Sequence, residues 1–109
     1  MGLTKTEIFT DEQNQLAILL KALAHPARIA ILQQIINAKA CICGDLSTEL
    51  GLAQATISQH LKELKNAGLI KGTIEGVSVC YCINPETWAG LKDQLNGFLN
   101  LAEIKTSCC

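Results

Sequence analysis

Six cysteines, grouped in three close pairs, are the residues of this sequence with the most distinctive chemistry. Thiolates bind soft ions such as Zn²⁺, Cd²⁺ and Cu⁺, and trivalent arsenic and antimony share this preference for sulfur. A single cysteine is usually a small buried hydrophobic residue, but that explanation does not account for three pairs. The pattern therefore predicts a site for a soft metal or metalloid. The cysteines concerned are Cys41, Cys43, Cys80, Cys82, Cys108 and Cys109.

The spacing within two of these pairs is typical of a β-strand. Side chains two positions apart point to the same face of a strand, so each Cys-x-Cys pair presents both thiols together. Ile42 and Tyr81, the residues between the cysteines, then point to the opposite face. The vicinal third pair could join a metal site, or could form a disulfide or a persulfide-derived bridge with another cysteine.

The expected cellular compartment decides the redox state of these thiols. Residues 1–15 lack the apolar core of a signal peptide, and no apolar run is long enough to span a membrane. We therefore expect a cytoplasmic protein, whose cysteines are thiols rather than structural disulfides. The sequence has no Cys-x-x-Cys motif and no His/Asp or paired-carboxylate constellation, so we do not expect an enzyme.

Hydrophobic periodicity predicts four amphipathic helices that must position these cysteines. A capping box at Thr10 and Gln13 begins the first helix, His25-Pro26 separates it from the second, and Asn84-Pro85 precedes the last. The side chains expected to face the core are Leu16, Leu19, Leu20 and Leu23; Ile29, Leu32, Ile35 and Ile36; Ile57, Leu61 and Leu64; and Trp88, Leu91, Leu95, Phe98 and Leu99.

The middle of the chain predicts a helix-turn-helix followed by a β-hairpin. A short helix, a turn at Gly51 and a helix from Gln54 to Gly68 form the helix-turn-helix over residues 45–67. β-branched runs flank Glu75-Gly76 and predict a hairpin wing over residues 69–83. With a brief strand at residues 40–43, the order is that of a winged helix-turn-helix, mainly α with a small β-hairpin, in a single domain over residues 1–109.

The winged-helix order also predicts where the cysteines meet. In winged helices the short strand before the helix-turn-helix commonly pairs with the second strand of the wing. That pairing would join the two Cys-x-Cys pairs in one cluster of four thiols. Trivalent arsenic would take three of them in a pyramid, whereas zinc would take four as a tetrahedron.

Several linked segments resemble the ArsR/SmtB family of repressors. LAHPARIAIL (residues 23–32) resembles the second helix of that family, and GDL (44–46), LGL (50–52) and QATISQHL (54–61) resemble its helix-turn-helix. KNAGLI (65–70) is similar to the segment that leads into the wing, and the resemblance covers roughly residues 16–85. It implies a homodimeric, sequence-specific DNA-binding transcriptional repressor that releases operator DNA when an inducer binds, with residues 10–24 and 86–104 as dimerisation helices.

The cysteines depart from the family pattern in register. Metal-sensing relatives carry Cys-x-Cys directly before an aspartate, but Gly44 separates Cys43 from Asp45 here, and Ser47 replaces a third cysteine found in some arsenic sensors. A site of His and acidic residues on the last helix is absent, because residues 86–104 contain no His. The first expected inducer is As(III) or Sb(III), followed by Zn, Cd or Cu; a redox-sensing or persulfide-sensing repressor is the alternative.

The second helix of the motif is expected to read DNA. If its apolar stripe faces inward at about 100° per residue, the opposite face carries the polar side chains that contact bases and phosphates. The DNA-binding candidates are Gln54, Thr56, Ser58, Gln59, Lys62 and Lys65.

Two features keep a different function open. The net charge is −1, and the wing tip at residues 73–77 carries no basic residue, so DNA binding must depend on local lysines and arginines. We expect Arg28 and Lys71 to contact the DNA backbone, and His60 to pack or to contact phosphate rather than to ligate metal. The rival is a winged-helix interaction or metal-binding module that does not bind DNA.

Overall fold

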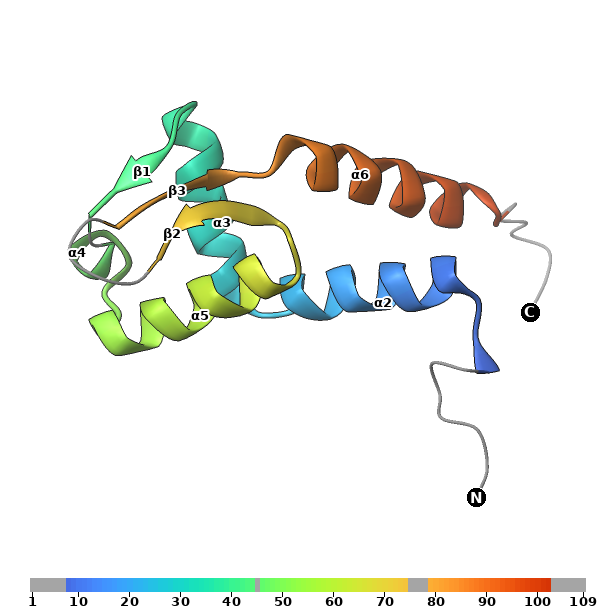
Figure 1. The fold of residues 1–109 in the computed structure, drawn as a ribbon, viewed down its shortest axis with the longest axis horizontal. Helices are drawn as coiled ribbons and strands as arrows, with labels where there is room; N and C mark the ends of the chain where they lie inside the picture. The colour runs from blue at the N-terminus through green and yellow to red at the C-terminus, as the bar shows by residue number, and fades with distance from the viewer. Residues whose placement is uncertain (1–7, 45, 75–78, 103–109) are drawn as a thin grey trace, which may run out of the picture.

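The structure, a computed structural model, describes residues 8–44, 46–74 and 79–102. Helices and strands follow one another in the predicted order (Figure 1). The winged helix-turn-helix predicted from the sequence is therefore confirmed. The elements are α2 (Asp11–Leu23), α3 (Pro26–Ala38), β1 (Ile42–Cys43), α4 (Ser47–Leu50), α5 (Gln54–Asn66), β2 (Ile70–Thr73), β3 (Cys80–Ile83) and α6 (Pro85–Asn100).

The three strands form one antiparallel sheet in the order β1-β3-β2. The short strand before the helix-turn-helix pairs with the second wing strand, as predicted, with Ile42 opposite Tyr81 and Cys43 opposite Cys80. On its other edge β3 pairs with β2, where Gly72 lies opposite Tyr81. The turn that joins β2 to β3 lies outside the described residues, and so does most of the predicted wing tip.

Local signals in the sequence explain where the helices begin and end. The Thr10 hydroxyl accepts from the Gln13 amide while the Gln13 side chain accepts from the Thr10 amide, which is the predicted capping box. At the end of α5, Gly68 adopts a φ of 84°, and the amides of Gly68 and Leu69 donate to the carbonyls of Lys65 and Leu64. This Schellman arrangement requires a left-handed residue, which glycine adopts without a steric penalty.

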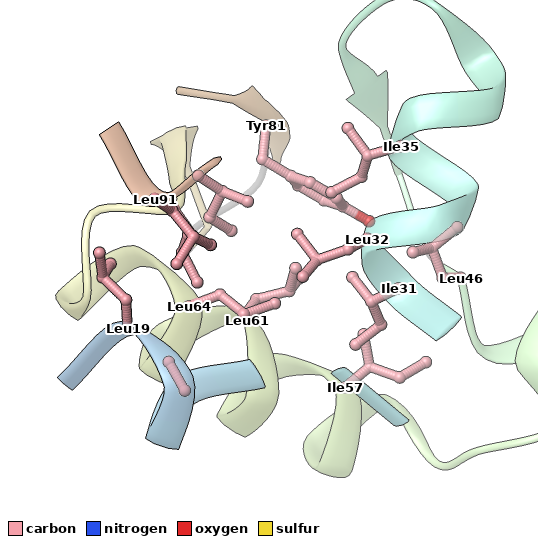
Figure 2. Packing of buried hydrophobic residues seen from close by; sticks show 13 residues of the cluster. Leu19, Ile31, Leu32, Ile35, Leu46, Ile57, Leu61, Leu64, Tyr81 and Leu91 are labelled. Carbon is pink, nitrogen blue, oxygen red and sulfur yellow. The ribbon is translucent and has the colours of Figure 1, made fainter. Parts of the chain in front are cut away.

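The hydrophobic core lies where α2, α3, α5 and α6 meet the sheet (Figure 2). Leu64 of α5 and Ile31 of α3 are fully buried, and Tyr81 reaches the same core from β3. Because Tyr81 points inward, the cysteines on either side of it point away from the core. The buried residues are Leu19, Ala22, Ile31, Leu32, Ile35, Leu46, Ile57, Leu61, Leu64, Leu69, Ile70, Tyr81 and Leu91.

Two of the predicted apolar stripes are wrong in part. Ile29 and Ile36 are 47% and 45% exposed, because the core contacts the neighbouring face of α3, which carries Ile31. Phe98 and Leu99 are also exposed, at 56% and 59%, because α6 continues past the core alongside α2 (Figure 1). Periodicity identifies an apolar face, but the packing of neighbouring elements decides how much of that face is covered.

No single helix among the described residues is long and apolar enough to cross a membrane. Only α2 and α3 taken together reach that length and composition, and they are bent by 89° relative to each other.

Candidate DNA interface and thiol site

The helix-turn-helix consists of α4, a tight turn and α5. Gly51 ends α4 with a φ of 68°, and its amide donates to the Ser47 carbonyl. Leu46, which is buried, occupies the N-cap position of α4. The buried Leu46 anchors α4 against the core and so sets where α5 begins.

One face of α5 is buried and the opposite face is exposed, as the sequence predicts. Ile57, Leu61 and Leu64 are in the core. Of the six candidate DNA contacts, Ser58 is half-buried and the other five are exposed. Those five are Gln54, Thr56, Gln59, Lys62 and Lys65.

Several of these polar side chains make local hydrogen bonds. The Gln54 Nε2 donates to the Ser58 Oγ at 3.4 Å, and the Gln59 Nε2 donates to the Glu63 Oε1 at 3.2 Å. Both bonds are on the solvent-exposed surface, where exchange for another partner costs little. Lys65 differs, because its ammonium donates to the Gly72 carbonyl at 2.6 Å and thereby links α5 to the wing.

A groove lies between α5 and the base of the wing. It has a volume of about 470 Å³ and contains four of the side chains predicted to contact DNA. Ile74 and Val79, on either side of the undescribed wing turn, complete its wall. The exposed face of α5 is therefore continuous with the wing.

Arg28 and His60 form an internal contact that the sequence did not predict. The Arg28 guanidinium donates through Nε to the His60 Nδ1 at 3.1 Å and through Nη1 to the Ala22 carbonyl at 3.3 Å. His60 is only 8% exposed, and its ring lies 4.4 Å from that of His25. Arg28 thus ties α3 to α2 and α5, and its contact with the DNA backbone stays a prediction.

The His60 contact predicts a dependence of stability on pH. Burial lowers the pKa of His60, and the neighbouring His25 and Arg28 lower it further. Because the folded protein holds this imidazole neutral while the unfolded chain protonates it at an ordinary pKa, the stabilisation is present above about pH 6.5 and is lost as the pH falls from there. We expect the free energy of unfolding, measured with urea, to fall over this range.

Replacing the imidazole with a neutral acceptor tests this prediction. His60→Gln retains an acceptor for Arg28 but cannot be protonated, so its unfolding free energy should depend less on pH than that of the wild type. His25→Gln is the matched control and should keep the larger part of the His60 contribution, which comes from burial. Identical pH profiles for the wild type and His60→Gln would contradict the prediction.

The two cysteines that lie opposite each other on β1 and β3 form a disulfide. The Cys43 and Cys80 sulfurs are 2.07 Å apart and the Cα atoms are 4.0 Å apart. The Gly44 amide donates to the Val79 carbonyl just beyond the pair, which makes Cys43 and Cys80 a non-hydrogen-bonded pair, the closer of the two kinds in an antiparallel ladder. The expectation that all cysteines are thiols is therefore wrong for this pair, since the strand register brings the two side chains into bonding distance.

The other two strand cysteines are free. The strand pairing that sets Ile42 opposite Tyr81 also sets Cys41 opposite Cys82, one residue further along each chain segment. A hydrogen bond with the Cys82 side chain raises the pKa of the Cys41 thiol. Cys41 is exposed and Cys82 is partly covered, so this thiol pair is open to reagents in solution.

The four strand cysteines are close together but do not form a metal cage here. Among the described residues, no group of three or more His, Cys, Asp or Glu side chains is arranged to hold a metal ion. With Cys43 and Cys80 joined, two thiols are left on this face of the sheet instead of the predicted four. Cys108 and Cys109, the other predicted ligands, lie outside the described residues.

Comparison with known proteins gives consistent matches. Residues 25–71 match the family described as "Bacterial regulatory protein, arsR family". The chain is 35% identical over 72 residues to the HTH-type transcriptional regulator YgaV of Escherichia coli (strain K12), a match that covers 66% of this chain and 73% of YgaV. It is 36% identical over 80 residues to the HTH-type transcriptional regulator NmtR of Mycobacterium tuberculosis, which covers 73% of this chain and 66% of NmtR.

Solved structures agree with these sequence matches. HlyU from Vibrio cholerae N16961 superposes with a TM-score of 0.63 at 30% identity, covering 77% of this chain and 91% of HlyU. The match to the HTH-type transcriptional repressor SmtB of Mycobacterium tuberculosis has 44% identity and covers 46% of that protein. Together with the 66% of NmtR that is covered, this means that the chain spans about half to two thirds of the length of these relatives. On the combined sequence and structural matches, the chain belongs to the arsR family of bacterial regulatory proteins.

Proposed function

We propose that this protein is a homodimeric, sequence-specific DNA-binding transcriptional repressor that leaves its operator when a thiol-seeking inducer reacts with its strand cysteines. The observation that carries the proposal is the exposed polar face of α5, which belongs to a helix-turn-helix and continues into the groove beside the wing. In proteins of this architecture the second helix of the motif enters the major groove.

The side chains of α5 suit this role in their chemistry and spacing. Gln59 can make a bidentate contact with adenine, and Lys62 can neutralise a phosphate. The N-cap residue, Ala53, has no side chain that accepts a hydrogen bond, so the first turn of α5 keeps backbone amides for a phosphate oxygen. These local contacts offset the net charge of −1.

A second copy of the chain is proposed to cover the exposed apolar surface of α2 and α6. Ile18 on α2, and Phe98 and Leu99 on α6, are each more than half exposed. The two helices contact each other and extend together away from the core (Figure 1). Apolar surface gathered in this way is typical of an interface between subunits.

The strand cysteines occupy a position from which they can influence both parts of the DNA-binding surface. Cys43 lies three residues before Leu46, the N-cap of α4, and Cys80 lies in the second strand of the wing. A ligand that draws these strands together or apart would change the position of the wing relative to α5. In the reduced protein, the four thiols would bind As(III), Sb(III) or a soft divalent or monovalent ion.

A redox or persulfide signal is the second candidate, and the Cys43–Cys80 disulfide favours it. Formation of this bond removes two electrons and two protons from the two thiols. An oxidant such as hydrogen peroxide would accept them and be reduced to water. The inducer in that case is the oxidant, and no ion needs to be held.

The test uses double-stranded DNA selected from a random library with the purified protein. Affinity is measured against salt concentration, and then with arsenite, antimonite, Cd²⁺, Zn²⁺, Cu⁺, hydrogen peroxide or a persulfide donor added to the reduced protein. We expect affinity that falls steeply with salt, and release by at least one of these inducers.

Cysteine variants identify the site of response. Cys43→Ser and Cys80→Ser should each abolish release, whereas the control Cys108→Ser/Cys109→Ser, which removes two thiols outside the strands, should keep it. Absent or salt-insensitive DNA binding would favour the interaction module, and release that persists in both strand variants would overturn the assigned sensor.

A further inference from the structure

A largely apolar groove lies beside the free thiol pair, and the proposed function does not use it. The groove has a volume of about 420 Å³ and lies between the end of α3, the edge of the sheet and the start of α6. Ile35 and Ile36 of α3, Ile83 of β3 and Trp88 of α6 supply apolar side chains to its lining. Pockets that bind small molecules have volumes of about 300–1,000 Å³ and combine apolar walls with a few polar groups that orient the ligand. This groove therefore has the size and the lining of a small-molecule site.

The charge at this groove is positive. Among the described residues that line it, Lys39 is the only one with a charged side chain. Strand pairing sets a second lysine, Lys71, opposite Cys82, and partners across two strands point to the same face of the sheet. A hydrogen bond with the Cys82 side chain raises the pKa of the Cys41 thiol, so this thiol is uncharged at neutral pH and does not repel an anion. The polar group that best suits this groove is therefore an anion.

The backbone at Lys39 also points to a role for its side chain. Lys39 ends α3 with a φ of 55°, and among the described residues it is the only one other than glycine with a positive φ. This left-handed conformation costs a lysine about 1–2 kcal/mol, and glycine is the usual residue at such a helix end. A positive charge at a helix C-terminus recovers about 0.3–1 kcal/mol, which at most offsets that cost. The helix thus gains no net stability from this lysine, and strained residues of this kind are concentrated at ligand-binding sites.

We propose that this groove binds small carboxylates that carry one apolar chain. The Lys39 ammonium donates charge-assisted hydrogen bonds to the carboxylate oxygens, and the apolar chain leaves water to lie against Ile36 and Trp88. No covalent bond forms, and neither thiol reacts. Because binding needs only the groove, it does not depend on the proposed function.

The experiment compares octanoate with octanamide on the full chain, with the Cys43–Cys80 disulfide intact and the ionic strength low and constant. The two probes share an alkyl chain and differ in charge. Trp88, the single tryptophan, lines the groove, so its fluorescence reports binding. We expect one octanoate per chain, bound about fivefold or more tightly than octanamide. Equal affinities for the two probes would overturn the proposal.

Variants test the two parts of the site separately. Lys39→Gly removes the ammonium and relieves the left-handed strain, so the fold should be as stable as the wild type while octanoate loses its advantage over octanamide. Lys92→Ala removes one positive charge from the exposed surface of α6 and, as the matched control, should keep that advantage. Ile36→Ala reduces the apolar wall and should weaken both probes by a similar factor. A preference for octanoate that persists in Lys39→Gly, or unchanged affinities in Ile36→Ala, would contradict the assigned site.

Protection of the free thiols locates the ligand. In Cys108→Ser/Cys109→Ser with the disulfide intact, Cys41 and Cys82 are the only cysteines left to react with iodoacetamide. Saturating octanoate should slow alkylation of Cys82, which lines the groove, as measured by mass spectrometry of its peptide. Octanoate that binds without slowing this reaction lies elsewhere on the protein, and the groove is then not its site.

Discussion

The double variant Gln59→Ala/Lys62→Ala is expected to lower the affinity for the selected DNA by about 10- to 100-fold. Gln59 is the exposed side chain of α5 best suited to read a base edge, and Lys62 supplies a positive charge within the groove beside the wing. Loss of Gln59 should relax the sequence preference at one base pair. Loss of Lys62 should make the affinity less dependent on salt, because one phosphate contact fewer releases fewer counterions.

The matched control removes the same residue types from other helices. Gln33 on α3 and Lys92 on α6 are both exposed and lie outside the helix-turn-helix. Gln33→Ala/Lys92→Ala should leave both the affinity and its salt dependence close to those of the wild type. Electrophoretic mobility or fluorescence anisotropy titrations at several salt concentrations measure both quantities. Equal losses in the two double variants would mean that α5 is not the DNA-reading helix.

Gly72→Ala is expected to destabilise the fold by about 2–5 kcal/mol, the combined cost of backbone strain and overpacking. Gly72 has a φ of 123°, a conformation that side chains rarely adopt. A Cβ built there would come within 2.3 Å of the Cys80 carbonyl oxygen and within 2.9 Å of the Tyr81 Cα. Both are backbone atoms of the partner strand, so relief requires the two wing strands to separate.

Gly51→Ala separates strain from steric conflict. Gly51 also has a positive φ, of 68°, but a Cβ there meets no atom within 4 Å. This variant should therefore lose only about 1 kcal/mol, the ordinary cost of a left-handed non-glycine residue. Urea unfolding of both variants in the same redox state measures the difference. Equal losses would show that the close approach at Gly72 is relieved without separating the strands.

The sequence was enough to predict the role of residues whose structure depends on their neighbours along the chain. The capping box at Thr10, the glycine end of α5 and the buried face at Ile57 all follow from local rules, and the structure bears them out. Ile29 and Phe98 were misassigned, since their exposure depends on where α3 meets the core and how far α6 extends beyond it. Those distances are set by tertiary packing, which periodicity does not record.

The candidate sites divide in the same way. Strand periodicity and the winged-helix order were enough to predict that the two Cys-x-Cys pairs meet across β1 and β3. Their division into a bonded pair and a free pair depends on register to the single residue, which the sequence does not give. The Arg28–His60 contact joins residues 32 positions apart. The one hint in the sequence is that Arg28 and His60 are both polar residues next to the apolar stripes of their helices.

The bond between β1 and β3 has a topological consequence. It joins residues 37 positions apart, and α4, α5 and β2 all lie between them, so the oxidised chain encloses its helix-turn-helix in a covalent ring. Closing a ring of this size removes about 4 kcal/mol of chain entropy from the unfolded state. Because α2 and α6 share one hydrophobic core with the enclosed α5, that stabilisation applies to the fold as a whole. Within the folded protein, however, oxidation ties the two ends of the DNA-reading segment together, while α2 and α6, the helices proposed to hold the dimer, lie outside the ring.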